Sequence, residues 1–177
     1  KYETDGTFGW IKNLGGPDDW DVGVDIATDS NDNVYVVGYF NNTNTDSNGL
    51  LFNGEYMTTN GNRDILLLKY HADGTEIWGT NIGGTGDTAG DNAGLGIAID
   101  SSDNIYVTGY LNGTINFAGQ NLTADGTNAD ILVLKFTSTS ATPSAATPPA
   151  PICFPAGTPV LTDQGEIAID KIDPEKH

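Results

Sequence analysis

The chain has 177 residues, ordinarily enough for one domain with a tail, and its 24 acidic and 7 basic side chains give a formal net charge of −17. This charge makes nucleic acid and anionic membranes poor partners, because both are polyanions. Hydrophobic residues make up only 37% of the chain, no window has a sustained 3.6-residue apolar period, and no run approaches the ~18 apolar residues of a membrane span. We therefore predict an all-β protein of short strands and tight turns, without a membrane span.

The expected strands come in a repeated order, because several phrases of the sequence occur twice. Three pairs recur about 70 residues apart: DSNDNVYVVGYF (29–40) and DSSDNIYVTGYL (100–111), RDILLLKY (63–70) and ADILVLKF (129–136), GTFGWIKNLGG (6–16) and GTEIWGTNIGG (74–84). In the first pair, eight of twelve positions are identical. Each copy is one supersecondary unit, which cannot bury its apolar face alone.

Within each unit, short apolar runs alternate with turn residues. In the first copy, residues 34–37 are β-branched and aromatic, as in strands. Residues 65–68 and their counterparts 131–134 are near-continuous apolar runs, as expected of strands covered on both faces. Turn residues that tolerate left-handed backbone fill positions 30–33 and 72–74. The order is strand, Asp/Asn turn, strand, long variable loop, strand, Asp-Gly turn, strand. It predicts a four-stranded antiparallel sheet, the anatomy of a β-propeller blade.

The repeat is out of phase with the start of the chain. Residues 8–14 correspond to 76–82, the last strand of a unit; a complete unit follows at about 22–82, and three strands of another at about 95–136. We expect residues 8–14 to supply an outer strand, either to the second unit or to a neighbouring chain, because residues 131–134 otherwise lie beside an unprotected edge. Two units cannot close a ring of four to eight blades. Neighbouring copies, a longer precursor and an open double sheet all remain as explanations.

The phrases GIAIDSSDNIYVTGY, DILVLKF, HADGTEIW and NIGGTGD resemble SBBP-type β-propeller repeats, which occur mainly in extracellular bacterial proteins. The resemblance covers about residues 6–136. It implies a propeller fold for a two-repeat module at 1–136, and it implies no general catalytic residues.

Aromatic and histidine side chains give weaker indications. Trp10 and Trp78 are equivalent by repeat alignment, so we expect both to pack in the β core. Trp20 has no counterpart in the second unit; we expect it to pack under a loop, with an exposed contact for sugar or protein as the alternative. His71 and His177 have no companion at ligand spacing, so no zinc site is predicted.

Acidic and amide side chains in the turns suggest two kinds of modification or ligand site. Carboxylates suited to calcium occur at Asp18, Asp19, Asp21, Asp87 and Asp91. The phrases around them match neither an EF-hand loop nor a nonapeptide calcium repeat, so we predict solvated loops and no cofactor, with calcium as the alternative. Candidate N-glycosylation sequons, relevant only to a eukaryotic secretory route, start at Asn41, Asn112 and Asn121, in the loops after the second strand.

Residues 137–151, TSTSATPSAATPPAP, differ in character from everything before them. A Ser/Thr/Ala/Pro stretch of this kind predicts an extended linker with polyproline character, which separates the repeat module from residues 152–177. The single cysteine, Cys153, excludes an intrachain disulfide. A first residue Lys1 in place of Met suggests that an upstream segment was removed or left out.

The last segment carries the only motif with chemistry. ICFPAGTPVLTDQGEIAIDKI (152–172) resembles the start of a Hint domain, the self-processing module of Hedgehog proteins and inteins, over residues 153–177. The matching residues are Cys153, Gly157, Thr158, Val160, Thr162, Gly165, Ile169 and Ile172. The resemblance implies that the Cys153 thiol attacks the carbonyl of Ile152 and converts the amide into a thioester.

The activating part of that family's fold is missing from this sequence. The family's Thr-x-x-His motif does not occur before His177, and an unactivated thiol with a pKa near 8.5 is a weak nucleophile. We therefore expect this chain not to cleave itself and residues 157–172 to form at most a small hairpin or to dock elsewhere. A longer precursor would cleave after Ile152.

Three functions follow from these patterns. The first is a structural or adhesive β-repeat protein without catalysis, extracellular or on a cell or virion surface, which assembles with copies or neighbouring proteins. The second is the precursor of an autoprocessing Hint protein. The third is a propeller that binds glycans or calcium through its loops.

Overall fold

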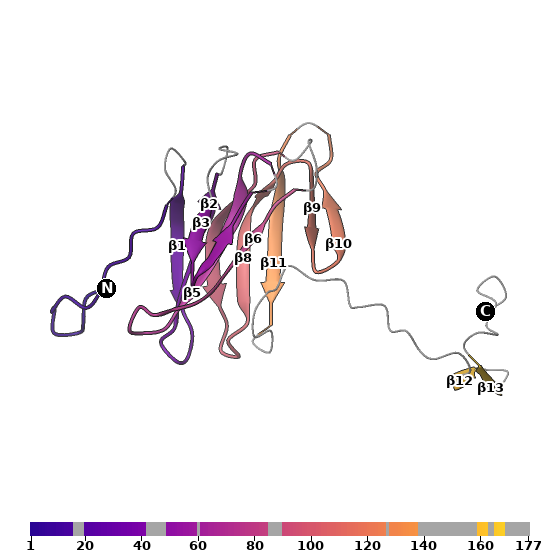
Figure 1. The fold of residues 1–177 in the computed structure, drawn as a ribbon, viewed down its shortest axis with the longest axis horizontal. Coiled ribbons are helices and arrows are strands. Elements are labelled where there is room, and N and C mark those ends of the chain that lie inside the picture. Colours follow the sequence, from indigo (N-terminus) through magenta and orange to yellow (C-terminus); the bar gives the residue numbers. More distant parts are fainter. Residues whose placement is uncertain are drawn as a thin grey trace. The chain divides into compact units, whose positions relative to one another are not determined.

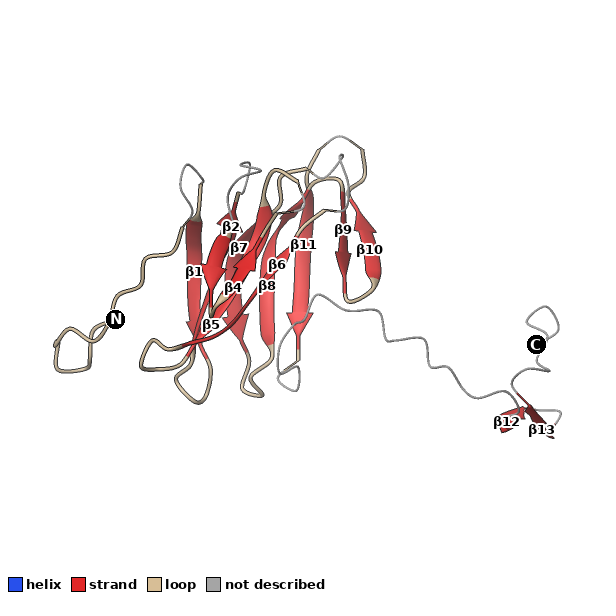
Figure 2. Ribbon diagram, in the orientation of Figure 1, coloured by secondary structure: helices blue, strands red, loops and turns tan. Residues whose placement is uncertain are grey.

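The computed structural model describes residues 1–15, 20–41, 49–59, 61–84, 90–126 and 128–137, and the backbone of 159–162 and 165–168. The chain divides into two compact units, Lys1–Ala146 and Thr147–His177. The described residues form strands and no helix (Figure 2), so the all-β prediction is confirmed. Accordingly, this part of the chain has no helical segment of the length and apolarity that crossing a membrane requires.

The first sheet is the complete four-stranded unit that the sequence predicts, and we refer to it as the first blade. Its strands are antiparallel neighbours in the order β1 (Val22–Thr28), β2 (Val34–Phe40), β5 (Asp64–Tyr70) and β6 (Glu76–Ile82) (Figure 1). The central strands β2 and β5 are buried at almost every position, on both faces of the sheet. Their near-continuous apolar sequences are the reason, as expected of strands covered on both sides.

The second blade has three antiparallel strands in the order β7 (Ala93–Ile99), β8 (Ile105–Leu111) and β11 (Asp130–Phe136). Among the described residues, no strand lies beside the outer edge of β11. The expectation that residues 8–14 complete this blade within the same chain is wrong. They form no strand, and Trp10 packs on Tyr70 of the first blade with ring centroids 5.9 Å apart. Pairing with a neighbouring chain stays a prediction.

A hairpin occupies the segment of each blade where the sequence predicts only a long variable loop. These hairpins are β3 (Leu50–Phe52) with β4 (Glu55–Met57), and β9 (Thr114–Phe117) with β10 (Gln120–Thr123). Their turns, Asn53-Gly54 and Ala118-Gly119, have positive φ at all four residues, as in a type I′ turn. The Asn-Gly dipeptide is the sequence signal for such a hairpin, and it is lost in the second copy because Ala118 replaces Asn.

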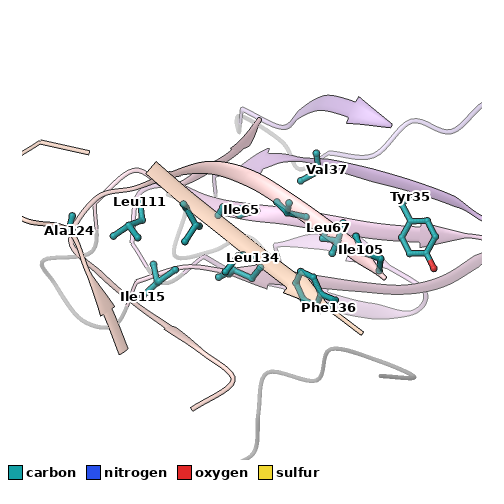
Figure 3. Packing of buried hydrophobic residues seen from close by; sticks show 13 residues of the cluster. Tyr35, Val37, Ile65, Leu67, Ile105, Leu111, Ile115, Ala124, Leu134 and Phe136 are labelled. Atoms are coloured by element: carbon teal, nitrogen blue, oxygen red, sulfur yellow. The ribbon is translucent and has the colours of Figure 1, made fainter. Parts of the chain in front are cut away.

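The two blades stack face to face around a shared apolar core, as the repeat predicts. Figure 3 shows Val37, Ile65 and Leu67 of the first blade gathered with Ile105 and Leu134 of the second. A second apolar cluster covers the opposite face of the first blade, where its own hairpin packs; it includes Phe40, Leu50, Phe52, Leu66, Leu68 and Tyr70. The first blade therefore has apolar packing on both faces.

One repeated glycine in each blade is fixed by close backbone contact. Gly38 and Gly109 occupy equivalent places in Val-Gly-Tyr and Thr-Gly-Tyr, each beside an irregularity in the pairing of the first two strands of its blade. A Cβ at Gly38 would overlap the carbonyl oxygen of Val22, and one at Gly109 would overlap that of Ala93. The repetition of this glycine is therefore a packing requirement.

The Thr147–His177 unit is described only by the backbone of one hairpin. Its strands, β12 (Pro159–Thr162) and β13 (Gly165–Ala168), pair antiparallel with Pro159 opposite Ala168. The predicted small hairpin after residue 157 is confirmed at this level. Residues 138–151, nearly all of the predicted linker, lie outside the described residues.

Candidate functional site

The most closely repeated phrase of the sequence builds the turn between the first two strands of each blade. In the first blade, the buried Asp29 carboxylate accepts hydrogen bonds from the backbone N–H groups of Asn31 and Asn33, both at 3.0 Å. It also accepts from the Asn33 side chain at 2.9 Å and the Tyr35 hydroxyl at 3.1 Å, and Lys69 Nζ lies 3.3 Å away. The phrase is repeated because the fold uses its carboxylate, so it does not indicate a ligand site.

The second blade repeats this turn with a more exposed carboxylate. Asp100 accepts hydrogen bonds from Ser102 N–H, from the backbone and side chain of Asn104, and from the Tyr106 hydroxyl at 2.9 to 3.1 Å. The hydrogen bonds from the Asn104 side chain and backbone lower the pKa of Asp100 to about 2. At Asp29, burial raises the pKa, but the hydrogen bonds from Asn33 and its neighbours outweigh burial and the pKa is lowered.

The turn predicts a pH-dependent difference between the wild type and Asp100→Asn. A carboxyl whose pKa is depressed in the folded state stabilises the fold above its unfolded pKa of about 3.9 and loses that contribution as pH falls through the folded pKa. The wild type should therefore be more stable than Asp100→Asn by a constant amount above about pH 5. The difference should shrink between about pH 4 and 2. Urea unfolding at a series of pH values measures it, and a difference as large at pH 2 as at pH 7 would contradict this account.

Polar side chains fasten the two blades to each other. Ser30 of the first blade donates to Asp103 of the second twice, from its backbone N–H at 2.9 Å and its hydroxyl at 2.6 Å. In the other direction, the Ile97 N–H of the second blade donates to the Asp25 carboxylate at 2.9 Å. The interface between the two blades thus has hydrogen bonds in addition to its apolar core.

A second polar contact lies where the chain passes from one blade to the next. Asn92 is fully buried; its N–H donates to the Arg63 carbonyl at 3.0 Å, and its Oδ1 accepts from the Asn112 N–H at 3.0 Å. Beside it, Arg63 and Asp91 form an ion pair at 3.1 Å. These contacts hold the blades in one relative position, so the outer faces of the two blades have a fixed orientation relative to each other.

The outer face of the second blade is largely apolar, and no other described part of the chain covers it. We define this open face by three cross-strand pairs of β8 and β11: Tyr110 with Ile131, Thr108 with Val133, and Tyr106 with Lys135. Ile131 is 85% exposed and Val133 is 68% exposed, whereas their counterparts in the first blade, Ile65 and Leu67, are both 0% exposed. The expectation that residues 131–134 are covered on both faces is therefore wrong for this chain.

The opposite end of the stack carries a groove of about 850 Å³. It lies between the N-terminal segment and the outer face of the first blade, and its walls include Trp10, Leu14, Ile26, Asp32, Val36 and Tyr70. Burial, with a smaller effect of the Glu76 charge, raises the pKa of Tyr70 to about 12. In the described part of the chain, the open face and the groove thus leave apolar side chains accessible at the two ends of the stack, and sequence periodicity alone distinguishes neither.

Only two of the five candidate calcium ligands lie in the described part of the chain, because Asp18, Asp19 and Asp87 lie outside it. Of the other two, Asp91 forms the ion pair with Arg63, and Asp21 lies beside Gly15. The described residues contain no group of three or more His, Cys, Asp or Glu side chains placed to hold a metal ion. Calcium binding stays an alternative to the predicted solvated loops. The prediction that only a longer precursor cleaves between Ile152 and Cys153 also stays a prediction, because both residues lie outside the described part of the chain.

The sequons differ in accessibility. Asn121 is exposed on β10, where its Oδ1 accepts from the Asn116 side chain at 2.7 Å. Asn41 and Asn112 follow β2 and β8 directly and are only partly exposed. Asn121 is thus the most accessible of the three to a modifying enzyme, although glycosylation itself is untested.

The tryptophans fall into two groups. Trp78 packs on Tyr35 with ring centroids 6.1 Å apart and Trp10 packs on Tyr70, which confirms both as packing residues. Trp20 is 72% exposed, so the expectation that it packs under a loop is wrong. An aromatic side chain next to β1 is left in solvent.

Stacked antiparallel sheets built from one repeated unit define an all-β repeat protein of blade-like units. A family model described as a beta-propeller repeat, SBBP, matches residues 9–46, about a fifth of the chain. The match takes in the Trp10 segment, β1, the Asp29 turn and β2. No curated protein matches the chain. The comparison supports the blade and gives no support for a Hint module in residues 153–177.

Proposed function

We propose that this chain is a structural or adhesive β-repeat module of an extracellular, cell-surface or virion-surface protein. It acts by stacking its blades on copies of itself or on neighbouring proteins, without catalysis of its own. The observation that carries this proposal is the pair of uncovered surfaces: the open face, with Ile131 and Val133 in solvent, and the groove over the first blade. Exposed apolar patches of this kind mark interaction sites on soluble proteins.

Two further observations agree with a structural role. The repeated phrases around Asp29 and Asp100 are the most distinctive in the sequence. Their carboxylates accept hydrogen bonds from groups of their own turns. The net charge of −17 suits a highly soluble surface protein, because self-repulsion opposes indiscriminate association. Association should therefore be restricted to surfaces with matched shape and chemistry. The location is inferred from the resemblance to SBBP repeats and stays a proposal.

Light scattering during size-exclusion chromatography tests the assembly function. The full chain at physiological salt is expected to show a mass that rises with concentration above the 18.6 kDa of one copy. Salt is needed because the acidic copies otherwise repel each other over roughly 10 Å or more. A mass constant at 18.6 kDa over the whole concentration range would contradict assembly with copies.

A further inference from the structure

We infer that copies of this chain assemble head to tail, with the open face of one copy's second blade seated in the groove on another copy's first blade. The inference rests on the proposed assembly function, and it adds the partner, the two surfaces and the residues that meet. The interface between the first and second blades is the model for this contact. In it, the face of the first blade that is equivalent to the open face packs on the face of the second blade that is equivalent to the groove.

The apolar residues of the open face correspond to residues of the first blade that are buried against the second blade. By repeat alignment, Ile131 and Val133 correspond to Ile65 and Leu67. The latter two are fully buried against the second blade, in the core that Figure 3 shows. The open face of the second blade is therefore chemically a copy of a mating surface, with the blade that should cover it missing.

The groove is the complementary half of the same interface. Ile97 on β7 packs against the core between the blades, and its counterpart on β1, Ile26, is 62% exposed at the wall of the groove. Val36, which also lines the groove, corresponds to Val107, which is buried in that core. A second blade from another copy would give Ile26 and Val36 the surroundings that Ile97 and Val107 have within the chain.

The donor and the acceptor of a hydrogen bond like the one between the blades are also present on the two surfaces. Within the chain, Ser30 donates to Asp103. The repeat counterpart of Ser30 is Ser101, which is exposed, and that of Asp103 is Asp32, which lines the groove. Asp32 and Asp103 share the same left-handed backbone, with φ of 60° at both. Neither Ser101 nor Asp32 has a side-chain partner among the described residues, so Ser101 of one copy is placed to donate to Asp32 of the next.

The N-terminal segment lies where the preceding blade's last strand belongs. Trp10 corresponds to Trp78, which packs within the core between the blades, and Trp10 packs on Tyr70 at the equivalent face of the first blade. An incoming second blade brings β11, whose outer edge has no neighbouring strand among the described residues. Residues 8–14 can then become the fourth strand of that blade, which pairs the exposed edge.

Joining different surfaces of identical copies gives a heterologous contact, which closes into a ring or runs on as a filament. Propellers close with about four to eight blades, so rings of about two to four copies with two blades each are expected. The number of copies depends on the angle between blades at the new interface. If that angle matches the one within the chain, a single ring size will dominate.

Two surface variants and their mixture test the inference. The open-face variant, Ile131→Glu with Val133→Glu, and the groove variant, Ile26→Glu, change exposed side chains, so circular dichroism should show both folded as the wild type is. Each variant alone should have the mass of one copy, 18.6 kDa, at concentrations where the wild type assembles. An equimolar mixture should form a complex of one copy of each and nothing larger, because one intact groove and one intact open face remain. As a matched control, Leu51→Glu alters an exposed leucine on neither surface and should assemble as the wild type does.

The outcomes separate this inference from the broader proposal. If the wild type assembles and either variant forms assemblies of the same mass as the wild type, the contact does not need both surfaces. The head-to-tail contact is then refuted, and the assembly function stands. The head-to-tail contact is also refuted if both variants are single copies and their mixture gives no complex, because the intact groove of one variant then does not bind the intact open face of the other. A wild type that stays at 18.6 kDa at every concentration refutes both the head-to-tail contact and assembly with copies.

Discussion

Replacing Leu67 with Ala is expected to lower the free energy of unfolding by about 3–5 kcal/mol, one of the two largest effects in the chain. Leu67 is 0% exposed in the core between the blades, so truncation removes apolar contact and leaves a cavity in a closely packed region. Urea unfolding of dilute protein measures the loss. A change below about 1 kcal/mol would show that the blades do not pack on each other as described.

The matched control lies at the repeat-equivalent position of the second blade. Val133 is 68% exposed, so Val133→Ala should change the stability of a single copy by no more than about 0.5 kcal/mol. The same substitution should weaken assembly, because Val133 lies on the open face. A large loss of stability in dilute solution would mean that this side chain is buried within the copy.

The second large effect is expected at Asp29, where Asp29→Ala should cost about 3 kcal/mol or more. The substitution leaves the partly buried Lys69 ammonium and the N–H groups of Asn31 and Asn33 without their acceptor. Breaking a buried ion pair from one side is costly because the remaining charge stays desolvated. Thermal and urea unfolding at neutral pH, where the carboxyl is ionised, measure the effect.

Two comparisons establish the cause. Asp100→Ala removes the equivalent turn carboxylate from a more exposed site and should have the smaller effect. Combining Asp29→Ala with Lys69→Met should recover part of the loss, since an apolar side chain replaces the stranded charge. Equal losses at Asp29 and Asp100 would contradict the importance of burial.

Much of the fold could be predicted from the sequence, because repetition fixes the phase of the strands. The predicted complete unit at 22–82 coincides with β1 to β6, and the three strands of the second unit end at Phe136 as expected. The hairpins were harder to foresee. Their apolar strands are only three or four residues long, and the second copy has lost the Asn of the Asn53-Gly54 signal.

The candidate site was beyond reach of sequence reasoning for a physical reason. Residues 131–134 have the pattern of a strand covered on both faces, yet Ile131 and Val133 are exposed. Periodicity shows that two faces are apolar, but exposure depends on how many blades stack, which is a property of the assembly. The motifs instead pointed to Cys153 and to aspartates of which several lie outside the described residues.

The unequal coverage of the two blades has a consequence for local unfolding. The first blade packs on both faces, against the second blade on one side and its own hairpin and N-terminal segment on the other, whereas the open face leaves the second blade packed on one. Cooperative units with fewer buried contacts open at lower free energy, so amide hydrogen exchange in a single copy should be faster in β11 than in β5. In a closed ring every blade would have a neighbour on each side. Amide protection would then even out around the ring, with no weakest blade from which unfolding or proteolysis could start.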